Sequence, residues 1–272
     1  MQGEFCFLCV LVVLFAIIFG LCRGIYHVLH PVSGTQTMPT IVTSIRQEDD
    51  NGLSDEDKLR AILSDDTAYP AELQELVQKN PETLDYVYHY PTASVTASTG
   101  AAALSEEETA GGVPLLIQWD SRWGYQRYGS GLIGYTGCGP TCLSMVVVGL
   151  TGDETATPAA VAEFAEQNGY YSSGTGTMWA LMSEGCSHFG LTARELPLME
   201  QSMAAALADG QPIIASVGPG DFTNNGHFIV ITGDSDEGFT VHDPNSVQRS
   251  ERTWSFEELQ GQIKNMWAFS RV

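Results

Sequence analysis

Two short segments carry the residue types of a thiol hydrolase, and the first is Gly137-Cys138-Gly139-Pro140. It places a cysteine after a flexible glycine and just before a proline that can open a helix. Cys138 is therefore expected at a helix N-terminus. There, unpaired amides and the positive end of the helix dipole favour a thiolate and can bind a developing oxyanion. For an isolated cysteine, a small buried residue at a helix cap would be the better interpretation.

The second segment begins with a histidine at the start of an apolar, strand-like run, and a further run of this kind follows it. If Gly233–Gly238 is the loop of a β-hairpin, antiparallel register places His227 nearly opposite Asp243 or Pro244. A carboxylate there could orient the imidazole, which would take the thiol proton and later protonate the leaving amine. Alone, His227 could simply begin a core strand and Asp243 cap a turn. Their occurrence together with the cysteine favours the catalytic interpretation.

Together with Gln118-Trp119-Asp120 and Trp123, these segments resemble the C39-like peptidase family over roughly 113–272. The resemblance implies a papain-like fold and a triad with Cys138 as nucleophile, His227 as general base and acid, and Asp243 as the residue that orients the histidine. It also implies an upstream glutamine in the oxyanion hole.

Gln118 matches the glutamine of the family, but it lies further upstream of Cys138 than is usual. An insertion must therefore lie between the two residues. Gln126, inside that stretch, is a second candidate for the oxyanion hole.

The elements that must position these residues predict an α+β domain at 113–272. Helices are expected at 140–150, 158–167, 178–189 and 200–209, and strands at 212–217, 228–232, 238–242 and 265–270. The strand segments are rich in β-branched or aromatic residues and are bounded by Gly, Pro or Asp. Helices followed by an antiparallel sheet agree with the papain-like cysteine peptidase fold that the resemblance implies, with its N-terminal helices packed on that sheet.

Residues 5–22 form an apolar run of eighteen residues without a charge. Such a run can cross most of a ~30 Å hydrocarbon layer, so we interpret 1–30 as a transmembrane or signal-anchor segment. A cleaved signal peptide is the alternative, but the run is longer than an h-region and has no basic n-region or small-residue cleavage site. Arg23 favours a cytoplasmic C-terminal side, whereas the long polar stalk favours an extracellular one. We expect a single-pass protein of the cell membrane with its catalytic domain outside.

Three further segments connect this anchor to the domain. They are a polar tether at 31–52, a small helical module at 53–91 and a flexible linker at 92–112. The module has a capping-box pattern after Ser54, and Pro70 and Pro81 stand where they can each open a short helix. The linker is rich in Ala, Thr, Ser and Gly, with few large apolar side chains.

The formal charge of −21 and its distribution along the chain argue against a basic interaction surface. Residues 47–108 hold fifteen of the 33 acidic residues and only three Lys or Arg, and the domain has seventeen acids against seven bases. Phosphate backbones need a basic stripe, so nucleic acid is not expected as a partner. The expected partners are a peptide or protein substrate and, through the N-terminal helix, the membrane.

The domain contains three cysteines, an odd number that fits a free thiol better than a disulfide scaffold. Pairing of Cys142 with Cys186 stays open. A metal site formed by Cys138, Cys142, His227 and His242 is not favoured, because Cys-x3-Cys running into a helix is not the usual Cys-x2-Cys knuckle. We therefore expect no metal and no organic cofactor.

The sequence thus predicts a membrane-tethered cysteine peptidase. One alternative is a cell-wall peptide amidase or transpeptidase, since the same triad serves any acyl transfer. The other is a non-catalytic surface binding module on the same scaffold.

Overall fold

The structure is a computed structural model that describes residues 52–93, 95–97 and 103–272, all within one compact unit, Ser44–Val272. The predicted anchor at 1–30 and the tether up to residue 51 lie outside the described residues. Among the helices that are described, none combines the length and apolar character needed to cross a membrane. Membrane tethering therefore stays a prediction.

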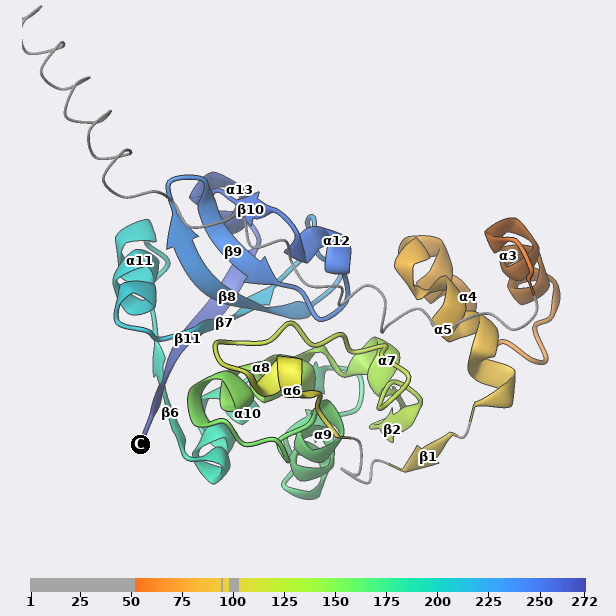
Figure 1. The fold of residues 1–272 in the computed structure, drawn as a ribbon, viewed down its shortest axis with the longest axis horizontal. Helices are drawn as coiled ribbons and strands as arrows, with labels where there is room; N and C mark the ends of the chain where they lie inside the picture. Colours follow the sequence, from red (N-terminus) through yellow and green to blue (C-terminus); the bar gives the residue numbers. More distant parts are fainter. Residues whose placement is uncertain (1–51, 94, 98–102) are drawn as a thin grey trace, which may run out of the picture. The chain divides into compact units, whose positions relative to one another are not determined.

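The central element is a six-stranded sheet in which all neighbouring strands are antiparallel (Figure 1). In spatial order its strands are β10 (Thr253–Trp254), β9 (Gly238–His242), β8 (His227–Ser235), β7 (Ile213–Val217), β11 (Ile263–Arg271) and β6 (Leu191–Glu195). Every residue of β7 is buried, because apolar side chains cover both faces of the sheet at its centre.

Alternate residues of the central strands face two separate hydrophobic clusters. Ile214 and Val230 belong to the cluster that also contains the interior of helix α8 (Cys138–Thr151) and of α9 (Pro158–Gln167). Ile213 and Ile229 belong to the other cluster, which includes side chains of α11 (Glu200–Ala208) and α13 (Phe256–Gln260). Helices on an antiparallel sheet confirm the predicted α+β class.

The main helices start and stop at the residues that the sequence indicates. In α9 the Thr157 side chain accepts a hydrogen bond from the Ala160 amide, and Pro158 is the first helical residue. Helix α8 ends at Thr151, and the next residue, Gly152, has a φ of 72° in the left-handed region that favours glycine. The single helix predicted at 178–189 is wrong. The chain leaves helical geometry at Glu184 (φ −123°), which separates α10 (Ala180–Ser183) from the 3-10 helix η3 (Gly185–Phe189).

The β8–β9 hairpin has a different register from the predicted one. Strand β8 continues to Ser235, which pairs with Gly238, so the turn is much shorter than the predicted loop at 233–238. A shift between Ile231 and Gly233 then aligns Val230 with His242. His227 is consequently not directly opposite the end of β9, and only the path of the chain after β9 brings Asp243 to it.

The predicted helical module consists of α3 (Asp55–Ser64), α4 (Ala71–Lys79), the 3-10 helix η1 (Pro81–Thr83) and α5 (Leu84–His89). Ser54 caps α3 by accepting a hydrogen bond from the Asp57 amide. The buried side chains of the module, Ile62, Leu73 and Val87 among them, belong to the same cluster as the interior of α8. The module and the residues that follow it therefore share one hydrophobic core.

The described part of the predicted linker at 92–112 contains two ordered elements. Strand β1 (Thr96–Ala97) pairs in parallel with β2 (Gln126–Tyr128), and α6 (Glu106–Thr109) starts in a capping box at Ser105. The Glu108 carboxylate of α6 forms an ion pair with Arg122 at 2.7 Å. The proposed domain boundaries stay predictions, but the described residues on either side of the predicted linker belong to one hydrophobic cluster.

Candidate active site

Cys138 is the first residue of α8 and follows the short helix α7 (Ile133–Thr136). The interior of α8 is apolar and buried along most of its length, which fixes the position of its N-terminus. The Cys138 side chain is half-buried and forms no disulfide among the described residues. Its own amide and the next ones lie in the first turn, where helix N–H groups lack intrahelical partners. The predicted placement of the thiol at a helix N-terminus agrees with the structure.

The turn beside Cys138 depends on a glycine. A Cβ at Gly139 would lie 2.6 Å from Cγ2 of Thr177, so no larger residue fits without moving that side chain. Thr177 is buried and its hydroxyl is 2.9 Å from that of Tyr128. The residue after Cys138 is thus packed directly against Thr177, whose hydroxyl is paired with that of Tyr128.

His227, the first residue of β8, contacts both other members of the predicted triad. Its Nε2 lies 2.8 Å from Oδ1 of Asp243, and the Cys138 side chain is close enough to the ring to help raise its pKa. Because Nε2 is bonded to the carboxylate, Nδ1 is the nitrogen left for the sulfur. The sequence assigned these three residues from separate motifs, and the fold brings them together.

The charges around His227 favour its protonated form. Burial alone lowers the pKa of the ring, but the Asp243 carboxylate, its hydrogen bond and the contact with Cys138 outweigh burial and raise the pKa to about 10. At neutral pH the imidazole is therefore cationic, with a proton on Nδ1 facing the sulfur. An imidazolium in this position stabilises a neighbouring thiolate and holds the proton that a leaving amine needs.

Asp243 is fully buried and its carboxylate is surrounded by donors. Oδ1 accepts hydrogen bonds from His227 Nε2 and from the Asn245 amide, each at 2.8 Å. Oδ2 accepts one from Arg249 Nε at 2.5 Å. Burial raises the pKa of this carboxyl group, but His227 and Arg249 outweigh it and hold the pKa below its usual value. Asp243 is therefore ionised at neutral pH.

The sequence did not single out Arg249, which lies in the short helix α12 (Val247–Ser250). A motif could not reveal it, because its role follows from the fold of the loop after Asp243. A chemical signal did exist: a buried carboxylate has lone pairs for more donors than one histidine supplies. Arg249 also has a buried Nη2 without a hydrogen-bond partner among the described residues.

Gln118, and not Gln126, reaches the turn that precedes Cys138. The buried Gln118 side chain donates from Nε2 to the Gly134 carbonyl at 3.0 Å, and its backbone amide donates to Pro244 O at 2.7 Å, next to Asp243. Its Oε1 is buried without a hydrogen-bond partner among the described residues. The Gln126 side chain lies in β2 and donates instead to the Arg122 carbonyl at 3.2 Å.

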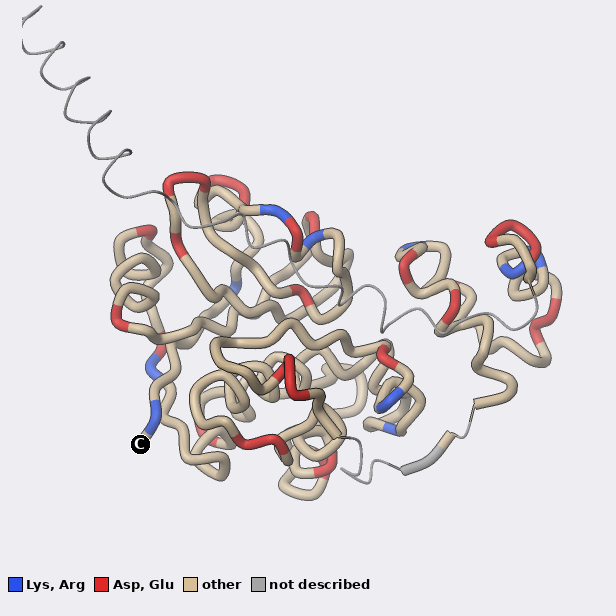
Figure 2. Tube along the Cα trace, in the orientation of Figure 1, with Lys and Arg blue, Asp and Glu red and all other residues tan. Residues whose placement is uncertain are grey.

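The remaining candidates have structural positions. Cys142 and Cys186 are both unpaired thiols, and burial raises their pKa values, that of Cys186 to about 11. The His242 ring is 3.1 Å from the Pro114 carbonyl, and burial lowers its pKa to about 4, so it is neutral. Over the described ranges, 52–93, 95–97 and 103–272, no group of three His, Cys, Asp or Glu side chains could hold a metal ion. Figure 2 shows the Lys and Arg positions of this part scattered among more numerous acidic ones.

Comparison with known proteins connects this geometry to a family. The sequence profile described as the Peptidase_C39 like family matches residues 111–270, more than half of the chain. No curated protein matches significantly. Among solved structures, one described as a candidate C39-like peptidase from Bacillus anthracis matches at 16% identity over 49% of this chain and 88% of that chain, with a TM-score of 0.31. That last likeness is too weak to carry an argument.

Proposed function

Because the chain belongs to the Peptidase_C39 like family, we propose that it is a cysteine peptidase with Cys138, His227 and Asp243 as its catalytic triad. The observation that carries the proposal is the buried His227 ring, which is hydrogen-bonded to Asp243 at 2.8 Å and close enough to Cys138 for the thiol to help raise its pKa. A buried histidine with a core role has no need of both a thiol and an ionised carboxylate.

Acylation uses only groups of this chain and the substrate. With the thiol proton on His227 Nδ1, the Cys138 sulfur attacks the carbonyl carbon of the scissile peptide bond. The carbonyl oxygen becomes an oxyanion, and the Cys138 backbone N–H and the second hydrogen of Gln118 Nε2 are the donors proposed to bind it. His227 then protonates the amine nitrogen, the C–N bond breaks, and a thioester remains on Cys138.

Deacylation restores the starting state. A water molecule gives a proton to His227 Nδ1 and attacks the thioester carbon, and the second tetrahedral intermediate collapses with release of the Cys138 sulfur. The new carboxyl group leaves with the acyl part of the peptide. Throughout both steps Asp243 keeps Nε2 as the bonded nitrogen and Nδ1 directed at the sulfur, which is the role of the third residue in such triads.

The experiment that tests this function is digestion of a peptide library by the purified chain, with Cys138→Ala as the control. Mass spectrometry of the products identifies the bond that is cleaved. Peptide cleavage by the wild type but not by Cys138→Ala supports the proposed peptidase activity. Products joined to an added amine would indicate the transpeptidase alternative, and ligand binding that survives Cys138→Ala without any turnover would indicate the binding module.

We propose further that the apolar run at 5–22 tethers this enzyme to the cell membrane with its catalytic domain outside. The support is the length of the run and the absence of charge within it. Alkaline carbonate extraction of cells that express the chain tests the anchor, and protease accessibility of the domain in intact cells tests the orientation. Release of the protein into the carbonate supernatant would contradict the anchor. Full protection of the domain from the protease would contradict the outside orientation.

A further inference from the structure

The helical module precedes the residues that the family match covers, which begin at 111. Membership in the family therefore assigns no role to α3, α4, η1 and α5. The structure nevertheless connects the module to the candidate active site in two separate places. One contact holds the loop that follows Asp243, and the other supports the turn that positions Gln118.

On the first side, the Glu82 carboxylate of η1 holds the start of helix α12. It accepts hydrogen bonds from the Ser246 hydroxyl, from the Val247 amide at 2.8 Å and from the Gln248 amide at 3.2 Å. These are unpaired N–H groups of a helix start, where a negative charge is favourable. Glu82 thereby holds the N-terminus of α12, and α12 itself contacts the candidate active site.

Helix α12 in turn is hydrogen-bonded to the proposed catalytic carboxylate, Asp243. Its residue Arg249 donates to Asp243 Oδ2, and the hydroxyl of Ser250 accepts a hydrogen bond from the Asp243 amide at 2.9 Å. Both side-chain and backbone groups of Asp243 are thus bonded to α12. A helix that moved would take with it the donors that hold the Asp243 carboxylate against His227.

Asn80 reinforces the same loop from the residue that caps η1. Its Oδ1 accepts a hydrogen bond from the Glu82 amide, while its Nδ2 donates to the Asn245 carbonyl at 2.5 Å. The Trp119 indole donates to the same carbonyl at 3.1 Å. The amide of Asn245 in turn donates to Asp243 Oδ1, so the peptide chain on either side of this residue is fixed.

On the second side, Tyr86 of α5 packs against Gly124 and against Gly134 of α7, the residue to which the Gln118 side chain is bonded. The Tyr86 hydroxyl donates to the Gly124 carbonyl at 2.8 Å, and the Gly134 amide donates to the same carbonyl at 2.9 Å. A Cβ at Gly134 would lie 2.2 Å from the Tyr86 oxygen, so contact is close. The Gly134 carbonyl is the acceptor for Gln118 Nε2.

We propose that the helical module at 53–91 is a built-in brace of the active site, in which Glu82 positions Asp243 through α12 and Tyr86 positions Gln118 through Gly134. Both act through other residues, so they are positioning residues and not catalytic ones. The proposal rests on the proposed function, because it assigns the two contacts to the triad and to the oxyanion hole. It also predicts that their losses have different signatures.

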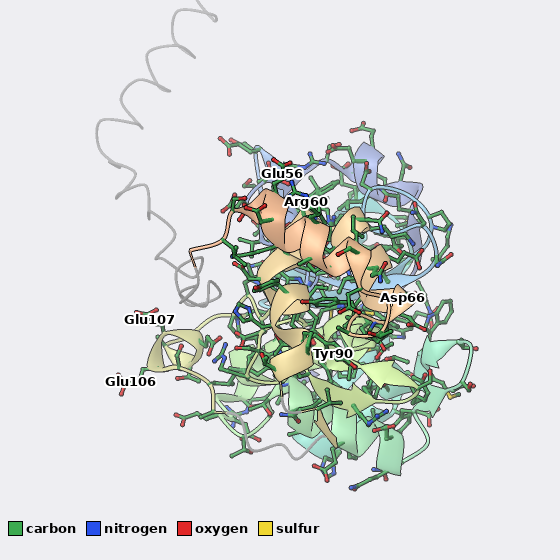
Figure 3. All side chains as sticks on the ribbon, turned by 90° about the vertical axis from the view of Figure 1, so that its right-hand side faces the viewer. Glu56, Arg60, Asp66, Tyr90, Glu106 and Glu107 are labelled. Atoms are coloured by element: carbon green, nitrogen blue, oxygen red, sulfur yellow. The ribbon has the colours of Figure 1, made fainter. Side chains whose placement is uncertain are left out.

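The test compares Glu82→Ala and Glu82→Gln with Glu56→Ala in the full chain. Glu56 is a matched control, since it lies in the same module, is exposed and forms an ion pair with Arg60 of its own helix at 3.0 Å (Figure 3). Alkylation of Cys138 is measured as a function of pH, together with the melting temperature. Glu82→Ala should lower the alkylation rate near pH 6 roughly 10-fold or more, while the rates converge at high pH, where thiols ionise unaided. Glu56→Ala should match the wild type.

Glu82→Gln keeps the shape of the side chain and one acceptor oxygen. It therefore tests the role of Glu82 even if Glu82→Ala does not fold. It should show an intermediate loss of reactivity near pH 6. A merely structural Glu82 would lower the melting temperature and leave the pH profile of Cys138 alkylation unchanged. That result in a folded Glu82 variant would overturn the proposal.

Tyr86→Phe tests the second contact, because it removes one hydroxyl and keeps the ring that stacks on Tyr125. Alkylation needs no oxyanion hole, so its pH profile should be unchanged while kcat on a peptide falls several-fold. An unchanged kcat would overturn this half of the brace. If wild-type Cys138 itself lacks acid-side reactivity, the proposed function has failed, whereas an activated wild type with an unaffected Glu82→Ala fails the brace alone.

Discussion

His227 Nε2 lies 2.8 Å from Asp243 Oδ1, and both side chains are buried. The pair makes the orientation of the imidazole a property of the fold, because one ring nitrogen is committed to the carboxylate before any substrate arrives. It also links catalysis to protonation. His227 has a raised pKa and Asp243 a lowered one, so the two are charged together across the neutral pH range.

Replacing Asp243 by Asn should shift the pH dependence of activity. The Asn side chain keeps the size and one acceptor but removes the charge that outweighs burial and raises the pKa of His227 to about 10. His227 should then lose its proton at lower pH, and the basic limb of the kcat/KM profile should move down by about 1 pH unit or more. A basic limb that stays in place would show that the carboxylate does not set the His227 pKa.

The same pair should contribute to stability in a defined pH window. Because the pKa of folded His227 is above its ordinary value of about 6.5, its contribution is fully present below about pH 6.5 and is lost as pH rises through about 10. Urea unfolding at pH 7 and pH 10 should therefore show a larger loss of unfolding free energy in the wild type than in Asp243→Asn. Equal losses would contradict the assignment.

Replacing Arg249 by Met should raise the pH of acid unfolding. Arg249 helps to hold the pKa of Asp243 below its usual value, so the stability from this carboxylate is present above the ordinary Asp pKa and is lost as pH falls through the lowered one. Without Arg249 that loss should begin at higher pH, and the lost charged hydrogen bond should cost about 1.5–3 kcal/mol at neutral pH.

Arg194→Met is the matched control for Arg249→Met. Arg194 is largely exposed and donates to the Gln211 side chain at 3.1 Å, far along the chain from the site. Its replacement should leave the midpoint of acid unfolding unchanged. Equal shifts in the two variants would mean that net charge, and not the contact with Asp243, sets the acid stability.

Gln118 and Gln126 can be separated by kinetics. Gln118→Ala should lower kcat by a factor of about 10² with a smaller change in KM, because an oxyanion donor acts mainly in the transition state. The rate of Cys138 alkylation should stay near that of the wild type, which shows that the site is still folded. Gln126→Ala should have little effect on either rate, and the opposite pattern would move the oxyanion role to Gln126.

Replacing Cys138 should affect turnover, whereas replacing Cys142 should affect stability. Cys138→Ala should abolish turnover with little change in stability, since its side chain is half-buried at the start of α8. Cys142 is fully buried within α8, and Cys142→Ala should cost about 1–2 kcal/mol of unfolding free energy while turnover persists. Peptide turnover and urea unfolding of the two variants check this, and a reversed result would remove Cys138 from its role.

Local sequence signals sufficed for the parts of the site that depend on near neighbours. A cysteine between glycines and before a proline predicts a helix start, and the structure has α8 begin at Cys138. The strand after His227 was likewise predictable, from its short run of apolar, mostly β-branched residues. These signals do not specify distance, so the proximity of Cys138 and His227 was an inference from their joint occurrence.

Features that depend on tertiary contacts could not be predicted. The register shift between Ile231 and Gly233 changes the strand pairing of the hairpin, and no residue type in the segment predicts it. The contact of Arg249 with Asp243 requires the particular fold of the loop between them. The contact of Glu82 with α12 joins segments more than a hundred residues apart, and such pairings leave no local pattern in a single sequence.

The most direct test of the account is the pH dependence of Cys138 alkylation by iodoacetamide in the wild type and in His227→Ala. Between about pH 4 and pH 9, an activated thiolate reacts at pH values where an ordinary thiol, with a pKa of about 8.5, does not. We expect selective labelling of Cys138 on the acid side, located by mass spectrometry, and its loss in His227→Ala. Labelling of Cys138 only at alkaline pH, or an identical profile in both proteins, would contradict the central claim that His227 activates Cys138.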